Sequence, residues 1–432
     1  MPKNNEVKFE DCFNLPNPGL KSYFDIVRTG QPEEYRTPFA KGNSVQKVLE
    51  EWEPFLSTLT DKEPSLVEFE NDQKAKVGPM SIMLPLEERI KDIDHYYEDI
   101  LLSSTPVSGK AIKATLSEFK QVRGLCPRSQ QKTVDLMKKS TNSGAPYFTK
   151  RRNVIAKTLS AQYGNLNVHI ETITNSGVLW KGAAVLGWRG QEGGPSRKDV
   201  KQRVVWMFPL SVNINELQVY QPLIESCQKF NLVPAWVSME SVDQRITRMF
   251  DTKGKDDVVI CTDFSKFDQH FNSDMQDAAA SILKSLLNSS SESIEWMENV
   301  FPIKYAIPLA YDYGKVRVGK HGMGSGSGGT NADETLAHRA LQYEAAINSN
   351  TKLNPYSQCL GDDGVLTFPG ITVDKVMEAY TAHGQEMNES KQYVSKHDCV
   401  YLRRWHSDHY RQNGICVGVY STYRALGRLI EQ

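Results

Sequence analysis

Two adjacent carboxylates, Asp362 and Asp363, lie between glycines in the tetrapeptide Gly361-Asp362-Asp363-Gly364. Short runs rich in strand-forming residues flank it within 356–368, and Asp-Gly between such runs is a strong local signal for a β-hairpin. Two carboxylates at a hairpin tip repel each other unless a cation neutralises them. Hard oxygen ligands favour Mg²⁺ or Mn²⁺. A solvated turn is the alternative, and a third carboxylate from elsewhere in the chain would favour the metal site.

That third carboxylate is Asp263, which directly follows a short apolar run at 258–262. The run predicts a buried strand. A helix should follow it, because Ser273 and Gln276 form a capping box. A carboxylate at the end of a strand that leads into a turn is a common place for a catalytic ligand.

Two cations, Lys201 and Arg203, precede an apolar run at 204–208 that is typical of a strand. Because side chains alternate across a strand, both cations are expected on one face. Together they could hold a polyphosphate, for which the planar guanidinium is especially suited. A solvated basic edge strand, which would discourage aggregation, is the alternative.

Five glycines lie within residues 322–329, directly before a helical pattern at 331–347. Glycines allow close approach of the backbone and give flexibility. Amides and hydroxyls therefore gather at a helix N-terminus, which favours a phosphate or sugar site. The segment is not a P-loop, because no Gly-Lys-Ser/Thr closes it. A flexible linker is the alternative.

Two further stretches carry polar or basic residues. The loop at 140–147 precedes the basic tripeptide 150–152 and would suit a phosphate backbone, with an ordinary polar loop as the alternative. The run at 399–405 is expected to form one strand. The His-Ser-Asp-His sequence at 406–409 is interpreted as a polar surface turn, because its spacing matches no common zinc finger.

Length and composition set broad limits. A chain of 432 residues suggests two or three subdomains. No apolar run approaches the ~20 residues that span a bilayer, so we expect no membrane segment. Seven scattered cysteines indicate a reducing compartment. The net charge of −1 permits a nucleic-acid partner without arguing for one. Residues 1–60 are expected to form an extended surface arm.

Taken in order, the stretches from about residue 140 to 405 resemble the right-hand RNA-dependent RNA polymerases of RNA viruses. The run at 325–334 makes the chain most similar to the polymerases of picobirnaviruses. The resemblance implies an α+β fold of fingers, palm and thumb, with an antiparallel palm sheet backed by helices. It divides the chain into a 1–60 arm, 61–250 fingers, a 251–405 palm with a fingers insertion near 290–320, and a 406–432 start of an incomplete thumb.

The resemblance also implies roles for single residues, in three groups. The catalytic group comprises three metal-binding carboxylates and a lysine that protonates pyrophosphate: Asp263, Asp362, Asp363 and Lys391. The nucleotide-binding group comprises Lys201, Arg203, Asp268, Ser325, Thr330 and Asn331. The group that binds template or product RNA comprises Thr141, Ser143, Gly144, Pro146, Gly326, Arg403 and Arg404. The implied cofactor is Mg²⁺, with Mn²⁺ as an alternative, in a two-metal mechanism.

The sequence departs from the family pattern at Glu334, where many relatives carry an asparagine that helps to read the ribose. Sugar discrimination is therefore expected to be arranged differently, through Asn331 for example.

The implied function is template-directed RNA synthesis from ribonucleoside triphosphates, for replication and transcription of a viral genome. A viral capsid protein is a further expected partner, and the virion interior or the host cytoplasm is the expected location. Two alternatives stay open. A reverse transcriptase shares the carboxylates, but it usually excludes the 2′-hydroxyl with a bulky residue, whereas Asp268 would accept that hydroxyl. A catalytically inert RNA-binding or capsid-associated protein would keep only the scaffold.

Overall fold

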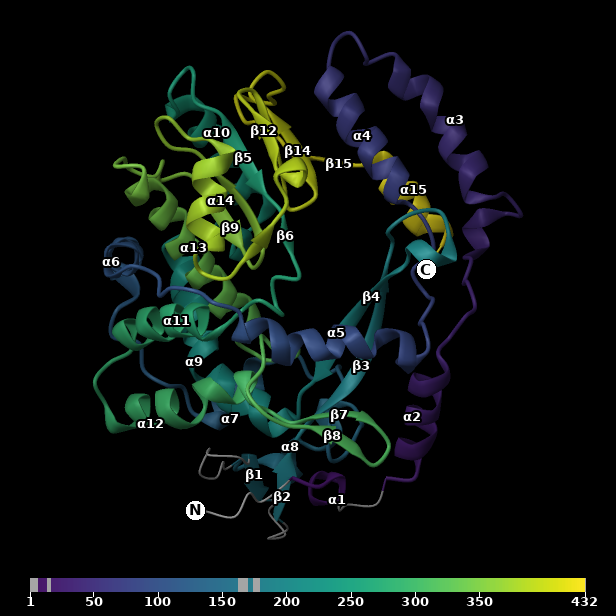
Figure 1. Ribbon diagram of the computed structural model, residues 1–432, viewed down its shortest axis with the longest axis vertical. Coiled ribbons are helices and arrows are strands. Elements are labelled where there is room, and N and C mark those ends of the chain that lie inside the picture. Colours follow the sequence, from purple (N-terminus) through teal and green to yellow (C-terminus); the bar gives the residue numbers. More distant parts are fainter. Residues whose placement is uncertain (1–6, 14–16, 162–169, 174–178, 432) are drawn as a thin grey trace.

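The computed structural model describes residues 7–13, 17–161, 170–173 and 179–431 (Figure 1). A four-stranded antiparallel sheet with the order β12-β5-β10-β9 carries the predicted carboxylates. Its strands are β5 (Val259–Thr262), β9 (Gln358–Leu360), β10 (Asp363–Leu366) and β12 (Tyr393–Ser395). All four residues of the central strand β5 are buried, as its run of apolar residues predicts.

Helices back this sheet, and the most central of them is α13 (Thr330–Asn348). It is buried on nearly all sides and packs against helices from distant parts of the chain. These neighbours are α6 (Gly109–Glu118), α11 (Ser273–Leu286) and α14 (Val373–Thr381). The arrangement confirms the predicted α+β class with an antiparallel sheet.

A second four-stranded sheet has the order β4-β3-β7-β8. Its strands are β3 (Ala184–Gln191), β4 (Lys201–Met207), β7 (Leu309–Asp312) and β8 (Lys315–Arg317). Strand β3 pairs with β4 antiparallel and with β7 in parallel, so segments more than a hundred residues apart share the sheet. Helix α5 (Leu86–Glu98) contacts β4 and crosses the direction of that strand in Figure 1.

The run at 399–405, which we expected to form one strand, is a hairpin instead. Strands β13 (Asp398–Tyr401) and β14 (Arg404–Ser407) pair antiparallel, and β15 (Val419–Tyr420) extends this sheet. The chain reverses at Leu402 and Arg403, whose φ angles are +52° and +63°. Neither residue type favours the left-handed region, so the sequence carried no turn signal.

Residues 1–60 are not simply an extended arm, since most of the described part is helical. Helices α1 (Phe9–Cys12), α2 (Gly19–Thr29) and α3 (Val45–Ser57) follow one side of the molecule (Figure 1). Phe24 is fully buried in α2, and α3 packs against the C-terminal helix α15 (Thr422–Ile430). The Ser44 side chain caps α3 by accepting a hydrogen bond from the backbone of Lys47.

Two helix boundaries also differ from expectation. Asn272, and not Ser273, caps α11, because its side chain accepts a hydrogen bond from the Met275 amide. Residues 373–387, whose sequence predicts a single helix, are helical only as far as Thr381, and β11 (Glu386–Met387) then pairs with β6 (Phe264–Ser265). The remaining elements are α4 (Pro64–Lys76), α7 (Gln130–Leu136), α8 (Ile155–Thr158), α9 (Leu210–Lys229), α10 (Met239–Thr252), α12 (Ser291–Asn299), β1 (Ile170–Ile173), β2 (Leu179–Gly182) and short 3₁₀ segments.

No helix in the described part of the chain combines the length and the apolar character needed to cross a membrane.

Candidate active site

The pairing of β5 with β10 brings the three predicted carboxylates together. Gly364 lies opposite Thr262 in the register, so Asp263 at the end of β5 stands beside the Asp362-Asp363 turn. Asp263 and Asp362 are exposed. Asp363 is more enclosed, and one of its carboxylate oxygens accepts a hydrogen bond from the Leu402 amide at 2.8 Å.

The electrostatics of this cluster fit a cation. Burial raises the pKa of Asp263, and the Asp362 charge raises it further, while Lys391 and Lys201 oppose the shift. Burial raises the pKa of Asp363 to about 7, with the Asp362 charge as the next cause. Carboxylates that repel one another in this way are stabilised by a bound ion, and an all-oxygen donor set suits a hard divalent cation.

Helix α13 holds the turn between β9 and β10 from behind. The Thr335 hydroxyl accepts a hydrogen bond from the Gly361 amide at 2.9 Å, and Nδ1 of His338 lies 2.8 Å from the Gly361 carbonyl oxygen. Burial lowers the pKa of His338 to about 4, so the imidazole is neutral at pH 7 and donates through Nδ1. A Cβ at Gly364 would lie 2.6 Å from the His338 ring, which explains the glycine there. Sequence reasoning identified neither Thr335 nor His338.

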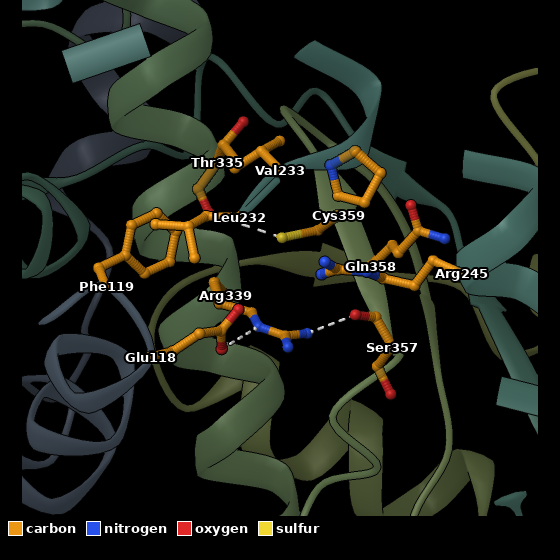
Figure 2. Close-up of a pocket in the computed structure, with 11 residues that line it drawn as sticks. Glu118, Phe119, Leu232, Val233, Arg245, Thr335, Arg339, Ser357, Gln358 and Cys359 are labelled. Carbon is orange, nitrogen blue, oxygen red and sulfur yellow. Dashed lines mark hydrogen bonds and ion pairs between the residues drawn. The ribbon is translucent and has the colours of Figure 1, made fainter. Parts of the chain in front are cut away.

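Figure 2 shows a small pocket on the same side of β9, where α13 contacts the strand. Arg339 lies between Glu118, to which it donates at 2.9 Å, and the Ser357 carbonyl oxygen at 2.7 Å. The Cys359 thiol contacts the Thr335 carbonyl at 3.5 Å. The strand that leads into the carboxylate turn is therefore fixed by polar contacts along its length.

Gln392 holds Asp263 from the other side. Its side-chain oxygen accepts a hydrogen bond from the Asp263 amide at 2.9 Å, and its Nε2 donates to the Asp263 carbonyl at 2.8 Å. The preceding residue, Lys391, is exposed, and its charge acts on Asp263. The structure thus brings the predicted lysine to the carboxylates, whereas no sequence signal marked Gln392.

The predicted cations of β4 also reach the site. Lys201 and Arg203 are both exposed, as alternation predicted. Charges from Asp263 and Lys391 act on Lys201, whose pKa is lowered by partial burial and then by Lys76 of α4. Nε and Nη2 of Arg203 donate to the Gln191 side chain at 3.0 and 2.6 Å, and its charge lowers the pKa of Asp268.

Asp268 and Glu334 form a carboxyl pair. Burial raises the pKa of both groups, and a hydrogen bond between the two side chains lowers the pKa of Asp268 and raises that of Glu334. Two buried carboxyls in contact share a proton more readily than both ionise. The Oε1 atom of Glu334 is buried and has no hydrogen-bond partner. The residue that departs from the family pattern thus lies against the predicted ribose-reading aspartate.

The glycine-rich loop is bonded closely to its surroundings. The Ser325 hydroxyl accepts a hydrogen bond from the Trp206 amide at 3.2 Å, and Thr330 donates to the Gly324 carbonyl at 2.8 Å. A Cβ at Gly326 would overlap the Trp206 carbonyl oxygen, so this glycine serves close approach. Asn331 is exposed and accepts a hydrogen bond from the Trp236 indole at 2.7 Å. Nucleotide contacts by these residues stay predictions.

The loop expected to contact the template exposes few of its predicted residues. Ser143, Gly144 and Pro146 are buried, and only Thr141 is exposed. The Ser143 carbonyl accepts a hydrogen bond from the Leu210 amide at 2.8 Å, which fixes the loop to α9. The buried residues therefore shape the loop, and RNA contact stays a prediction for Thr141.

The two arginines of the β13–β14 hairpin differ. Arg403 is exposed at the turn. Arg404 is buried and donates to Asp243 of α10 at 2.7 and 3.3 Å. The guanidinium of Arg404 is therefore turned into the protein and paired, and RNA contact by this residue stays a prediction.

The His-Ser-Asp-His sequence is only partly a surface turn. His406 is buried, with Nδ1 3.0 Å from the Cys416 carbonyl. Asp408 lies between two exposed imidazoles, 2.9 Å from Nδ1 of His397 and 3.2 Å from Nε2 of His409. Pairing with Asp408 accounts for both imidazole contacts without an ion.

The chain is similar in sequence to known viral polymerases. A family model described as viral RNA-dependent RNA polymerase matches residues 81–414. A curated protein of human picobirnavirus (strain Human/Thailand/Hy005102/-), named potential RNA-dependent RNA polymerase, is 61% identical over 420 residues, which are 97% of this chain and 78% of that protein.

The fold of the chain is also similar to solved structures of such polymerases. The crystal structure of a human picobirnavirus RNA-dependent RNA polymerase matches with a TM-score of 0.95 and 61% identity, over 98% of this chain and 80% of that one. An insertion-loop deletion mutant of such a polymerase matches with a TM-score of 0.96 over 98% and 83% of the two chains, again at 61% identity. A Sicinivirus RNA-dependent RNA polymerase, at 13% identity and a TM-score of 0.54 over 74% and 72%, shares the fold.

Proposed function

Because the chain belongs to the family of viral RNA-dependent RNA polymerases, we propose that it copies an RNA template into RNA for both replication and transcription of a viral genome. An enzyme of this class is a nucleotidyltransferase that acts on RNA and ribonucleoside triphosphates. The observation that carries the proposal for this chain is the strand pairing that sets Asp263 beside Asp362.

The residues at this position fit a divalent metal, for which Mg²⁺ is the proposed ion and Mn²⁺ an alternative. Asp263 and Asp362 would hold it, with Asp363 in support, since all three offer hard oxygen ligands and their charges repel when no cation is bound. Bound in pairs, such ions supply activation of the attacking hydroxyl and neutralisation of the charge on the phosphates.

Cations of the chain surround these carboxylates. Lys201 and Arg203 are proposed to hold the triphosphate, and their common face on β4 supports this role. Lys391 is proposed to protonate the departing pyrophosphate, because a positioned general acid lowers the barrier for a charged leaving group. Its charge already acts on Asp263, which supports a position beside the reacting phosphate.

Asp268 is proposed to read the 2′-hydroxyl, together with Ser325, Thr330 and Asn331. A site that hydrogen-bonds a hydroxyl rejects a substrate without it, because its buried polar groups are left unpaired. The unpaired Oε1 of Glu334 supports this assignment, since a hydroxyl could donate to it. Glu334 would then take the place of the asparagine amide.

Template and product RNA are proposed to contact Thr141 and Arg403, which are the exposed members of the predicted RNA-binding group, and Gly326, which is half-buried. A capsid protein as partner, and the virion interior or host cytoplasm as location, are proposed from the family resemblance alone.

Incorporation of labelled ribonucleotides on a homopolymer RNA template tests the proposal. We expect template-dependent RNA product with Mg²⁺ or Mn²⁺ and none in a chelator. Preferential incorporation of deoxyribonucleotides would indicate a reverse transcriptase. RNA binding without any incorporation, in either metal, would indicate an inert RNA-binding protein.

A further inference from the structure

Three charged side chains are fully buried beneath the glycine-rich loop, away from the metal-binding carboxylates. Lys304 lies in the 3₁₀ segment Phe301–Tyr305, Asp333 in the first turn of α13, and Glu216 in α9, and each has a relative exposure of 0%. Charged residues are almost never fully buried unless they are paired. Their contacts therefore indicate what they hold together.

Asp333 is the centre of one half of this network. Its carboxylate accepts hydrogen bonds from Tyr220 at 2.7 Å and Tyr305 at 2.6 Å, and it lies 3.0 Å from Nζ of Lys304. Nζ of Lys304 also lies 3.7 Å from the centroid of the Phe301 ring. Three donors on one carboxylate fix the position of the first turn of α13. The next residue in that turn is Glu334, the partner of the ribose-reading aspartate.

Glu216 is the centre of the other half, and its contacts reach the loop itself. Its carboxylate accepts hydrogen bonds from the Ser327 hydroxyl, from the Gly328 amide at 3.1 Å and from Asn213 at 3.2 Å. Asn213 also donates to the Gly326 carbonyl at 3.2 Å. Consecutive residues 326–328 are thus tied to one side of α9.

The two halves are joined by charge. Burial raises the pKa of Glu216, and the Lys304 charge is the largest influence that opposes this shift. Burial likewise lowers the pKa of Lys304, while Asp333 and Glu216 oppose it. A buried ion network is weak as a source of stability, because well-packed apolar residues often serve as well or better. Its contacts instead specify a single position for each group.

We propose that Glu216, Lys304 and Asp333 are positioning residues for nucleotide addition, which clamp the glycine-rich loop and the first turn of α13 into the shape that receives the ribonucleotide. The residues flanking the clamped segment, Ser325 and Thr330, belong to the proposed nucleotide site. A loop with five glycines has many alternative conformations, so without the clamp its backbone would be displaced. The inference rests on the proposed function, because its effect is on nucleotide use.

Two substitutions of similar volume at one position test the clamp. Glu216→Gln keeps a side-chain carbonyl that can accept from Gly328, whereas Glu216→Leu removes every acceptor. We expect Glu216→Leu to raise the KM for the ribonucleotide by about 10- to 100-fold per active enzyme, since a small misplacement remote from the chemistry can cost this much. Glu216→Gln should remain within about threefold of wild type, because an amide oxygen replaces the carboxylate as acceptor. Active enzyme is counted by single-turnover extension of a labelled primer on its template.

Two further variants keep the test decisive. Ser327→Ala removes one donor to Glu216 from a half-buried loop position, so it should fold even if Glu216→Leu does not, and we expect a KM increase of about 3- to 10-fold. Asp243→Asn weakens a buried ion pair elsewhere, and should lower the melting temperature with no change in KM. An unchanged KM in Ser327→Ala, or equal values for Glu216→Leu and Glu216→Gln, would overturn the clamp. A wild-type enzyme that makes no RNA would instead overturn the proposed function.

Discussion

Gln392 gives a sharp test of how Asp263, the proposed metal ligand, is held in place. Its side chain makes two hydrogen bonds with the backbone of Asp263. The side-chain oxygen accepts from the Asp263 amide at 2.9 Å, and the side-chain nitrogen donates to the Asp263 carbonyl at 2.8 Å. Gln392→Met keeps the length of the side chain and removes both bonds to Asp263, together with a third from Nε2 to the Asn388 carbonyl at 2.9 Å. A hydrogen bond contributes ~0.5–1.5 kcal/mol net, so the two bonds to Asp263 together contribute about 1–3 kcal/mol. The side chain of Asp263 is exposed, but its two backbone bonds to Gln392 are partly buried, so water replaces the lost partners only in part and the loss is expected toward the upper end of this range.

If these two hydrogen bonds stabilise the transition state by holding Asp263 in place, their loss should lower kcat/KM by about 5- to 150-fold, because 1.36 kcal/mol corresponds to a tenfold change in rate. Part of the loss should be recovered at higher Mg²⁺ concentration, since a displaced carboxylate binds the ion less well. Initial rates of primer extension across a Mg²⁺ titration measure both effects.

The chain offers a matched control at Gln130 of α7. The side-chain nitrogen of Gln130 donates to the Ala161 carbonyl at 2.7 Å, and its side-chain oxygen accepts from the Ala161 amide at 2.8 Å. No proposed catalytic residue takes part in these bonds. Gln130→Met should lower stability by a similar amount and leave the Mg²⁺ dependence unchanged. If Gln392→Met behaves like Gln130→Met in the Mg²⁺ titration, then Gln392 supports the fold and not the metal site.

Asp362→Asn should abolish RNA synthesis and leave RNA binding nearly intact, because it removes one negative charge from the proposed metal ligands. Primer extension and filter binding measure the two effects, and extension near the wild-type rate would show that Asp362 is not a metal ligand. Asp268→Ala should lower kcat/KM for ribonucleotides much more than for deoxyribonucleotides, and an unchanged ratio would leave Asp268 a structural role. Burial lowers the pKa of His321, His338 and His406 to about 4. The unfolded chain then binds more protons than the folded one, so stability should be fully present above pH ~6.5 and be lost as the pH falls toward 4, each imidazole contributing up to ~3 kcal/mol. Melting curves between pH 7.5 and 4.5 measure this, and a flat profile would contradict it.

The local signals in the sequence were enough for the elements that carry the main carboxylates. The Asp-Asp-Gly turn, the apolar run before Asp263 and the helix after the glycines all form as expected. Each depends on residues close in the sequence, either through turn chemistry or through hydrophobic periodicity. The pairing of β5 with β10 joins segments about a hundred residues apart, and only the family resemblance predicted it.

No comparable local signal marks the residues that support the site. Thr335 and His338 reach Gly361 only because α13 packs directly behind the turn. Gln392 reaches Asp263 because β12 pairs with β5. The left-handed turn at Leu402 and Arg403 directs Arg404 to Asp243. Each of these contacts is set by tertiary packing, which no local pattern encodes.

The sequence of helix α13 lacks the single apolar stripe of a surface helix, and its contacts explain why. Within its first turns, Asp333 faces the buried network, Glu334 faces Asp268, and Thr335 and His338 face the carboxylate turn. Because each direction around the helix meets a different partner, polar residues occur on all of them, and the apolar stripe of an amphipathic helix cannot form. The same helix therefore fixes the proposed metal-binding turn, the proposed ribose site and the glycine-rich loop relative to one another. A shift of α13 would displace all three together, so its buried polar contacts connect parts of the proposed site that are far apart in the sequence.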